Sequence, residues 1–163
     1  MTKTDNTLQR VIKEDIQSKE DMEMKVAYWS QGGNTQAMAE AVAEGIQAAG
    51  KEAELLDMEN ISAADLAGEA VLALGCPAMG DEVLEESVVE PLFTELEGSL
   101  AGKKVALFGS YGWGDGQWMR DWAERTANAG AAVIGGEGLI ANEYPDDDAL
   151  EACRALGKAM AEA

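Results

Sequence analysis

Short apolar runs alternate along the chain with longer segments whose apolar residues recur every three or four positions. The runs 70–75 and 104–109 are almost wholly apolar, which is typical of parallel strands that are buried on both faces. In the segment 35–49, Met38 and Val42 share one helical face, which predicts a helix. The whole pattern predicts strands at 24–29, 52–58, 70–75, 104–109 and 132–134 (the last one or somewhat longer), helices at 35–49, 117–129 and 146–161, and a short turn or helix at 62–66.

The alternation of strands and helices predicts an α/β fold. Strands joined in this way form right-handed crossovers, which gives a three-layer, doubly wound sandwich around a five-stranded parallel sheet. In such a sheet, ligands bind outside the carboxyl ends of the strands, where the strand order reverses. The loops 30–35, 76–82 and 110–116 each follow a predicted strand. We therefore expect the functional site at these three loops.

Length and composition indicate one globular domain with an appendage. The chain has 163 residues, of which 47% are hydrophobic and 26% are charged. Residues 1–23 differ from the rest, because they are polar, contain no glycine and carry Leu8, Val11 and Ile12 at helical spacing. They are predicted to form an N-terminal extension, either disordered or a short amphipathic helix. Residues 24–163 then form the domain.

The charge balance limits the partners. The chain carries 31 Asp and Glu residues against 12 Lys and Arg, a formal charge of −19. This argues against nucleic acid and anionic membranes, because both present negative charge, and it favours partners with basic surfaces. No apolar run is long enough to cross a bilayer, and the polar N-terminus lacks the apolar segment of a signal peptide. We therefore expect a cytoplasmic protein that binds neither nucleic acid nor membranes.

Missing and rare side chains limit the kinds of catalytic and metal site that the chain can form. Histidine does not occur, which excludes histidine-based catalytic triads and histidine-containing metal sites. The two cysteines, Cys76 and Cys153, lie far apart and are predicted to be buried free thiols. Acidic runs such as 146–148 lack the spacing of a calcium loop, so no metal site is expected, and 146–148 are predicted to cap the last helix. Trp118 and Trp122 lie four residues apart, which favours packing on one helix face.

The loop 30–35, with the sequence SQGGNT, lies between a predicted strand and a predicted helix. Its glycines let the backbone approach a ligand closely. Its free N–H groups and the helix dipole form an anion site that needs no lysine or arginine, and Ser30, Asn34 and Thr35 can add side-chain donors. The alternative is a glycine-rich turn in which Asn34 or Thr35 only caps the helix.

The other two loops carry an apolar and an aromatic side chain. In the loop 76–82, Gly80 can take a φ of either sign, so the peptide beside it can present C=O or N–H to a ligand; the alternative is an ordinary turn. In the loop 110–116, Trp113 lies between glycines, which suits it to stack on a planar ring unless it folds back onto its own domain. Together the three loops favour a phosphorylated flat heterocycle, and FMN is the best candidate.

Three motifs resemble a known family. The segments YWSQGGNTQAMA, LGCPAMGDEVLEESVVEP and GKKVALFGSYGWGDGQWMRDW are similar to those of short-chain flavodoxins of the anaerobe type. The resemblance covers nearly all of residues 24–163, and the motifs occur in the right order. It implies the flavodoxin-like strand order 2-1-3-4-5 and non-covalently bound FMN. The cofactor-binding residues that it implies are Ser30, Gln31, Gly32, Gly33, Asn34, Thr35, Pro77, Ala78, Met79, Gly80, Asp81, Glu82, Ser110, Tyr111, Gly112, Trp113 and Gly114.

By this resemblance, the loop 30–35 wraps the FMN phosphate, but its sequence departs from the family pattern Ser-Gly-Thr-Gly-Asn-Thr. Gln31 replaces a glycine and Gly32 replaces a threonine. The lost threonine hydroxyl is one hydrogen-bond donor to a charged group, worth roughly 1.5–3 kcal/mol if nothing replaces it. The amide of Gln31 is a possible substitute. The departure therefore bears on how tightly FMN is bound.

The resemblance also assigns roles around the flavin ring. Met79 and Trp113 form its two walls, and Gly112 with neighbouring backbone donors binds the pyrimidine carbonyls. Gly80 turns its carbonyl toward flavin N5 on the first reduction, which stabilises the neutral semiquinone, and Glu82 is the partner of N3–H. In an acidic protein the anionic hydroquinone is destabilised, so a low-potential semiquinone/hydroquinone couple is expected.

The function implied is that of a one-electron carrier, not an enzyme. It shuttles as a monomer between basic-surfaced redox enzymes, such as reductases, oxidoreductases and hydrogenase-type acceptors. One alternative is an FMN-dependent NAD(P)H or quinone reductase, although the chain has no extra segments to build a nicotinamide or quinone pocket. The other is a specialised flavodoxin-like reductant with weakened FMN binding, which the altered loop 30–35 and the N-terminal extension suggest.

Overall fold

The computed structural model describes residues 23–163, so all but the last residue of the predicted extension lies outside the described residues. Strands and helices alternate along the chain. The strands are β1 (Glu23–Tyr28), β2 (Glu52–Asp57), β3 (Val71–Gly75), β4 (Lys104–Tyr111), β5 (Ala132–Val133) and β6 (Leu139–Asn142). The helices are α2 (Asn34–Ala48), the 3₁₀ helix η1 (Met58–Asn60), α3 (Ala64–Ala67), α4 (Val89–Glu97), α5 (Gln117–Asn128) and α6 (Asp147–Glu162).

The sheet is parallel, and its strand order β2-β1-β3-β4-β5 confirms the expected 2-1-3-4-5 topology. The fifth position differs in detail from the single strand predicted at 132–134. There β5 pairs with the start of β4, and β6 pairs with its end. Between β5 and β6, Gly135 and Gly136 both have φ 81°, a left-handed conformation that glycine adopts easily. There the chain turns away from β4, and it pairs with β4 again in β6.

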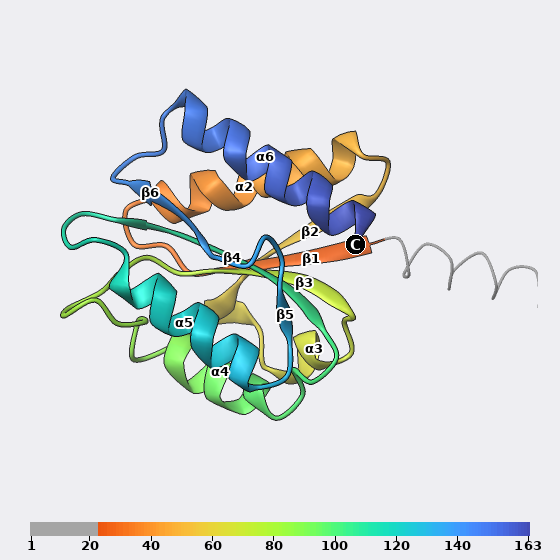
Figure 1. The fold of residues 1–163 in the computed structure, drawn as a ribbon, viewed down its shortest axis with the longest axis horizontal. Coiled ribbons are helices and arrows are strands. Elements are labelled where there is room, and N and C mark those ends of the chain that lie inside the picture. Colours follow the sequence, from red (N-terminus) through yellow and green to blue (C-terminus); the bar gives the residue numbers. More distant parts are fainter. Residues whose placement is uncertain (1–22) are drawn as a thin grey trace, which may run out of the picture.

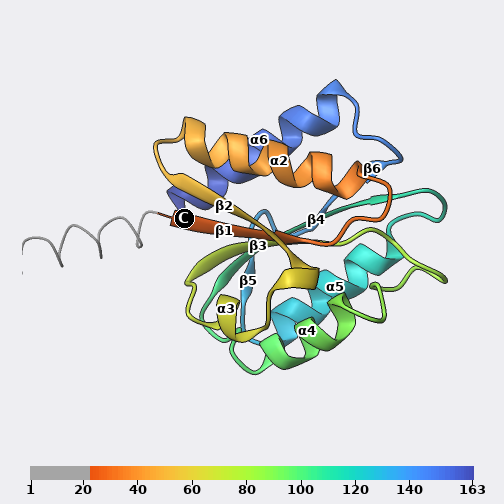
Figure 2. The ribbon, with the colours of Figure 1, turned by 180° about the vertical axis from the view of Figure 1, so that it is seen from behind.

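Helices cover both faces of the sheet, which gives the predicted three layers. Figure 1 shows α2 and α6 on one face and α3, α4 and α5 on the other, and Figure 2 shows the same layers from behind. Each interface contains a hydrophobic core. Phe93, Trp118 and Trp122 lie in the core under α4 and α5, and Met38 and Phe108 lie in the core under α2 and α6.

The helix α4 is not among the elements predicted from the sequence. Its buried residues Val89, Leu92, Phe93 and Leu96 have the spacing of a helical face, so the signal was present in the sequence. Pro91 obscures that signal, but it lies in the first turn, where a missing N–H breaks no intrahelical hydrogen bond.

Several smaller predictions are confirmed. Trp118 and Trp122 are buried packing residues. Cys76 and Cys153 are buried free thiols, and burial raises the pKa of each to about 12. Asp146 caps α6 by accepting the N–H of Ala149 at 2.8 Å. Within residues 23–163, no helix combines the length and the apolar character that a membrane span requires.

Two glycines allow α2 and α6 to pack in direct contact. A Cβ on Gly157 of α6 would meet the carbonyl of Val42 closer than 3.0 Å, and a Cβ on Gly45 of α2 would meet the backbone of Arg154 equally closely. Because these neighbours are backbone atoms, they cannot move aside as a flexible side chain would. The approach of the two helices therefore depends on the missing side chains.

A carboxylate organises the start of α4. Glu85 is buried and accepts hydrogen bonds from the N–H groups of Ser87 at 2.7 Å, Val88 at 2.7 Å and Val89 at 3.0 Å, and from the Ser87 hydroxyl. Burial raises the pKa of Glu85, but these hydrogen bonds outweigh it and hold the pKa below its ordinary value. The charged form of Glu85 is therefore stabilised by folding.

We predict that Gly157→Ala lowers the free energy of unfolding by roughly 1–3 kcal/mol, because the added methyl forces the backbones of α2 and α6 apart. Alanine is a better helix former than glycine, so helix propensity alone would predict a higher free energy of unfolding. Denaturant unfolding measures the change. Gly98→Ala is the matched control, because the nearest atom to its added Cβ lies 3.9 Å away. If Gly157→Ala is as stable as the wild type, the close packing is not required.

We also predict that Glu85→Gln reduces stability most at neutral pH. A folded pKa below the unfolded value contributes stability above the unfolded pKa, and this contribution is lost as pH falls through the folded pKa. The loss of unfolding free energy in Glu85→Gln should therefore be largest above about pH 5. It should shrink below about pH 4.3, the ordinary pKa of Glu. Denaturant unfolding across pH tests this, with exposed Glu86→Gln as the control. A difference that does not vary with pH would contradict the prediction.

Candidate functional site

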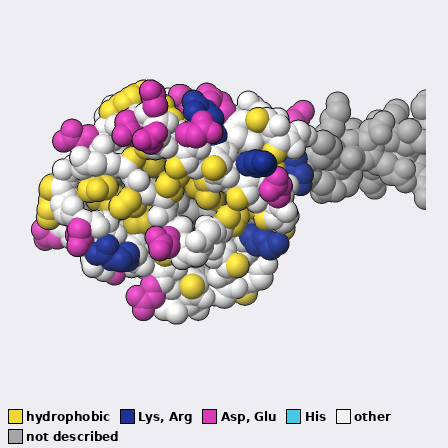
Figure 3. Space-filling view, turned by 45° about the horizontal axis from the view of Figure 1, so that its top comes forward, with side chains coloured by type: hydrophobic (Ala, Val, Ile, Leu, Met, Phe, Trp, Pro, Cys, Tyr) yellow, Lys and Arg dark blue, Asp and Glu magenta, His cyan; other side chains and the backbone are white. Residues whose placement is uncertain are grey.

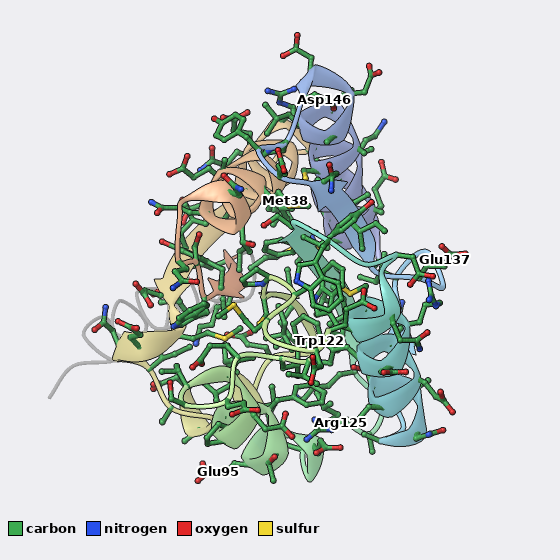
Figure 4. The ribbon with its side chains drawn as sticks, turned by 90° about the vertical axis from the view of Figure 1, so that its left-hand side faces the viewer. Met38, Glu95, Trp122, Arg125, Glu137 and Asp146 are labelled. Carbon is green, nitrogen blue, oxygen red and sulfur yellow. The ribbon has the colours of Figure 1, made fainter. Side chains whose placement is uncertain are left out.

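The three loops singled out by the sequence meet at one edge of the sheet. Because β1, β3 and β4 are adjacent and parallel, their carboxyl ends lie side by side, and Figure 4 looks onto this edge. A hollow of about 180 Å³ opens between the loops. It is lined by Ser30, Gln31, Gly32, Asn34, Thr35, Pro77, Ala78, Met79, Ser110, Tyr111, Gly112 and Glu143. The sequence therefore predicted all but one of the lining residues.

The loop 30–35 is shaped by its own serine and by a glycine. The Ser30 hydroxyl accepts the N–H of Gly33 at 3.1 Å and that of Gln36 at 3.2 Å, which folds the loop over the start of α2. Gly33, with φ 93°, is the N-terminal cap residue of α2, and the helix has no side-chain cap from that position. The alternative in which Asn34 or Thr35 only caps the helix is therefore not what the structure shows.

Thr35 connects this loop to the third one. Its side chain is 1% exposed, and its hydroxyl lies 3.1 Å from the hydroxyl of Ser110, which is also buried. The Ser110 N–H also donates to Thr35 Oγ1 at 3.4 Å. Only one of the two hydroxyls can donate to the other, so the pair retains one O–H for a ligand. The pair fixes the end of β4 against the N-terminus of α2.

The donors of the hollow suit a phosphate. The N–H groups of Gly32, Asn34 and Thr35 have no hydrogen-bond partner within residues 23–163, and the last two lie at the N-terminus of α2. Backbone N–H groups at a helix N-terminus bind anions. Among the described lining residues there is no lysine or arginine. The chemistry of this donor set therefore fits the phosphate of FMN without an ion pair.

The loop 77–82 contains a turn that is closed at its base. Met79 and Val83 exchange two backbone hydrogen bonds of 2.9 Å, and Ala78 donates to the carbonyl of Ser110 at 3.0 Å. Within the turn, Gly80 has φ 51° and no atom within 4 Å of where a Cβ would lie. The peptide bonds next to Gly80 therefore have space to rotate, because Gly80 has no side chain and no neighbour nearby. The base of the turn stays fixed.

Glu82 joins the second loop to the third. Its Oε1 accepts the N–H groups of Asp115, Gly116 and Gln117, each at 3.1 Å, so its carboxylate caps the N-terminus of α5. The residue holds this position with φ 57°, a left-handed conformation that costs a non-glycine residue energy. This cap was not foreseen from the sequence. The hydrogen bond of Glu82 to flavin N3–H stays a prediction.

Trp113 is presented to solvent at the tip of the third loop. Its side chain is 64% exposed, so it does not fold back into its own domain. Tyr111, by contrast, is half-buried against Trp118, with ring centroids 5.7 Å apart. An exposed tryptophan beside an anion-binding loop is suited to stack on a planar ligand.

Some predicted residues lie beside the hollow and do not line it. They are Gly33, Gly80, Asp81, Glu82, Trp113 and Gly114, all on the same three loops. Glu143 is the lining residue that sequence reasoning missed. It directly follows β6, a strand absent from the predicted pattern, and its N–H donates to the carbonyl of Tyr111 at 2.7 Å. Within the described residues, His, Cys, Asp and Glu side chains form no group that could hold a metal ion.

Comparison with known proteins agrees with this geometry. The sequence model of the flavodoxin family matches residues 26–157. The chain is 50% identical to a flavodoxin of Megasphaera elsdenii over 140 residues, which are 86% of this chain and 99% of the relative. It is 48% identical to a flavodoxin of Clostridium beijerinckii over 138 residues, 85% of this chain and 99% of the relative.

A solved structure shows the same fold. The solution structure of two-electron reduced Megasphaera elsdenii flavodoxin superimposes with a TM-score of 0.76, over 86% of this chain and 99% of that one, at 48% identity. Family model, sequence identity and fold all cover the residues that form the three loops. The chain belongs to the flavodoxin family of FMN-binding electron carriers.

Proposed function

We propose that this flavodoxin transfers single electrons at low potential between redox enzymes, with FMN held by the loops 30–35, 77–82 and 110–114. The observation that carries the proposal is the convergence of an anion cradle of backbone N–H and hydroxyl donors and an exposed tryptophan at one edge of the sheet. When bound, FMN supplies a ring that takes up and releases electrons one at a time. The domain proposed for this role is residues 24–163.

The loop 30–35 binds the phosphate in this proposal. The N–H groups at the start of α2 donate to it, the helix dipole favours its negative charge, and Ser30 Oγ keeps its own proton to donate. Thr35 and Ser110 contribute the remaining hydroxyl. Neutral donors on a rigid helix terminus can replace the water that a phosphate loses, which removes the need for a basic side chain.

Met79 and Trp113 flank the ring, and Glu82 and Gly80 act at its edge. The carboxylate of Glu82 keeps Oε2 available for a ring N–H while Oε1 caps α5. Gly80 supplies a peptide with room to turn, because its turn is fixed only at Met79 and Val83. Because Trp113 is exposed, a flavin stacked on it would be accessible to partners.

The acidity of the chain supports a low potential. Glu82, Asp115 and Glu143 lie on the loops around the site, and acidic side chains are spread over the face in Figure 3. One carboxylate about 10 Å away, at an effective dielectric near 20, disfavours an added negative charge by roughly 1.7 kcal/mol before screening. For one electron this is on the order of 70 mV. Several carboxylates therefore make the last electron strongly reducing.

The same charge supports partners with basic surfaces, such as reductases, oxidoreductases and hydrogenase-type acceptors, because opposite charge accelerates encounter. We propose that the carrier works as a monomer in the cytoplasm, since it must leave the flavin edge open to successive partners.

The proposed function predicts two separate one-electron reductions of bound FMN, the second at a lower potential than that of free FMN. A spectroscopic redox titration of the protein reconstituted with FMN measures both potentials, with free FMN in the same buffer as the control. Higher salt should raise the second potential, because it screens the carboxylates. A second potential at or above that of free FMN would falsify the low-potential assignment, even if FMN binds.

Position 32 provides a test of the phosphate cradle. We predict that Gly32→Thr binds FMN roughly tenfold or more tightly, because it adds a hydroxyl donor to a charged group. The structure has room for the change: no atom lies within 4 Å of the added Cβ, and φ lies outside the left-handed range. Calorimetric titration of the apoprotein with FMN measures the affinity.

Two controls accompany this variant. Gly68→Thr changes a glycine with equal space outside the site and should leave FMN affinity unchanged. Riboflavin lacks the phosphate, so Gly32→Thr should not tighten its binding. Equal tightening of both flavins would mean that the loop 30–35 does not hold the phosphate.

A further inference from the structure

Glu143 places a carboxylate residue on the wall of the hollow that contains the phosphate-binding donors. It lines the hollow together with Ser30, Gln31 and Thr35, although it lies more than 100 residues away in the sequence. The remaining lining residues are uncharged at neutral pH. Glu143 is thus the charged residue of the described lining. It is exposed to solvent, and its negative charge has the same sign as that of a phosphate.

The backbone holds Glu143 firmly in this position. Its φ of 57° is in the left-handed region, which a glutamate rarely adopts. Its N–H donates to the carbonyl of Tyr111 at 2.7 Å, and the Asn142 side chain donates to the same oxygen at 3.2 Å. The residue is therefore tied to the end of β4, next to the Ser110 that contacts Thr35. A strained backbone that persists in a site is a reason to look for a role.

The size of the hollow makes the charge effective. A sphere of 180 Å³ is about 7 Å across, less than the Debye length of about 8 Å at physiological salt. A phosphate held in the hollow would therefore lie within about one Debye length of Glu143, and salt would screen their repulsion only in part. Within the described lining there is no basic side chain to offset the repulsion.

We propose that Glu143 is a specificity-determining residue that opposes the phosphate of FMN and so sets how strongly the site prefers FMN to riboflavin. This inference rests on the proposed binding of the phosphate by the loop 30–35. Glu143 lowers the affinity for the phosphorylated flavin, while the riboflavin part of the ligand is bound independently of it. Together with Gly32, Glu143 reduces the contribution of the phosphate to the binding free energy of FMN, compared with what the hydrogen-bond donors alone would give.

The test compares Glu143→Gln with the wild type in calorimetric titrations of the apoprotein with FMN and with riboflavin. The variant should bind FMN more tightly, on the order of tenfold at low salt, because a dianion no longer faces a carboxylate. Its affinity for riboflavin should change less than twofold. The gain for FMN should shrink in about 0.5 M salt, where the Debye length falls to a few ångströms.

Glu137→Gln is the matched control, because it removes the same charge from an exposed residue between β5 and β6 that does not line the hollow (Figure 4). If Glu137→Gln and Glu143→Gln tighten FMN binding equally, the effect comes from net charge alone, which overturns the proposal. Weaker FMN binding by Glu143→Gln would show that the carboxylate accepts a hydrogen bond from the flavin, which also overturns it. Equal tightening of riboflavin would do the same.

A second variant guards against a folding defect. Asparagine tolerates the left-handed conformation better than glutamine, so Glu143→Asn should reproduce the gain for FMN with unfolding unchanged. A wild-type protein that binds neither flavin would contradict the proposed function itself. A wild type that binds FMN, with Glu143 variants that do not differ from it, would contradict only the role of Glu143.

Discussion

The parallel pairing of β3 with β1 on one side and β4 on the other is the constraint on which the site depends. The ladder continues past the strand ends: Trp29 donates to the Gly75 carbonyl at 3.0 Å, and Ala78 donates to that of Ser110 at 3.0 Å. These bonds keep the three loops in register where they leave the sheet. The backbone donors of the loop 30–35, Met79 and Trp113 are therefore held at the same edge of the sheet.

Carboxylates have a structural role in this acidic chain as well as an electrostatic one. Glu82 caps α5, Glu85 caps the start of α4, and Asp146 caps α6. In each case a negative charge lies at the positive end of a helix dipole, where it is stabilised. Part of the chain's net charge of −19 is thus needed to form the helices that surround the site. The Glu82 cap also ties the second of the proposed flavin-binding loops to the residues that follow the third.

The site combines two opposing electrostatic demands. An acidic surrounding makes an electron on the flavin easier to release, but it also repels the phosphate that anchors the flavin. In the proposed binding mode, backbone N–H groups at the start of α2 offset this repulsion locally, because they donate at hydrogen-bond distance while the carboxylates act over several ångströms. In that mode, Gly32 and Glu143 both weaken phosphate binding, the first because it lacks a hydroxyl donor and the second because of its negative charge.

The sequence alone determined the strand-helix alternation, the three functional loops and the family, because buried parallel strands are continuous apolar runs and the loop motifs are local. It also identified most residues that line the hollow. It did not reveal α4, whose helical spacing was obscured by Pro91, or β6. The cap from Glu82 to α5, the Thr35–Ser110 pair and the position of Glu143 were decided by tertiary structure. Each joins residues more than 30 positions apart, and such contacts leave no periodic signal in the chain.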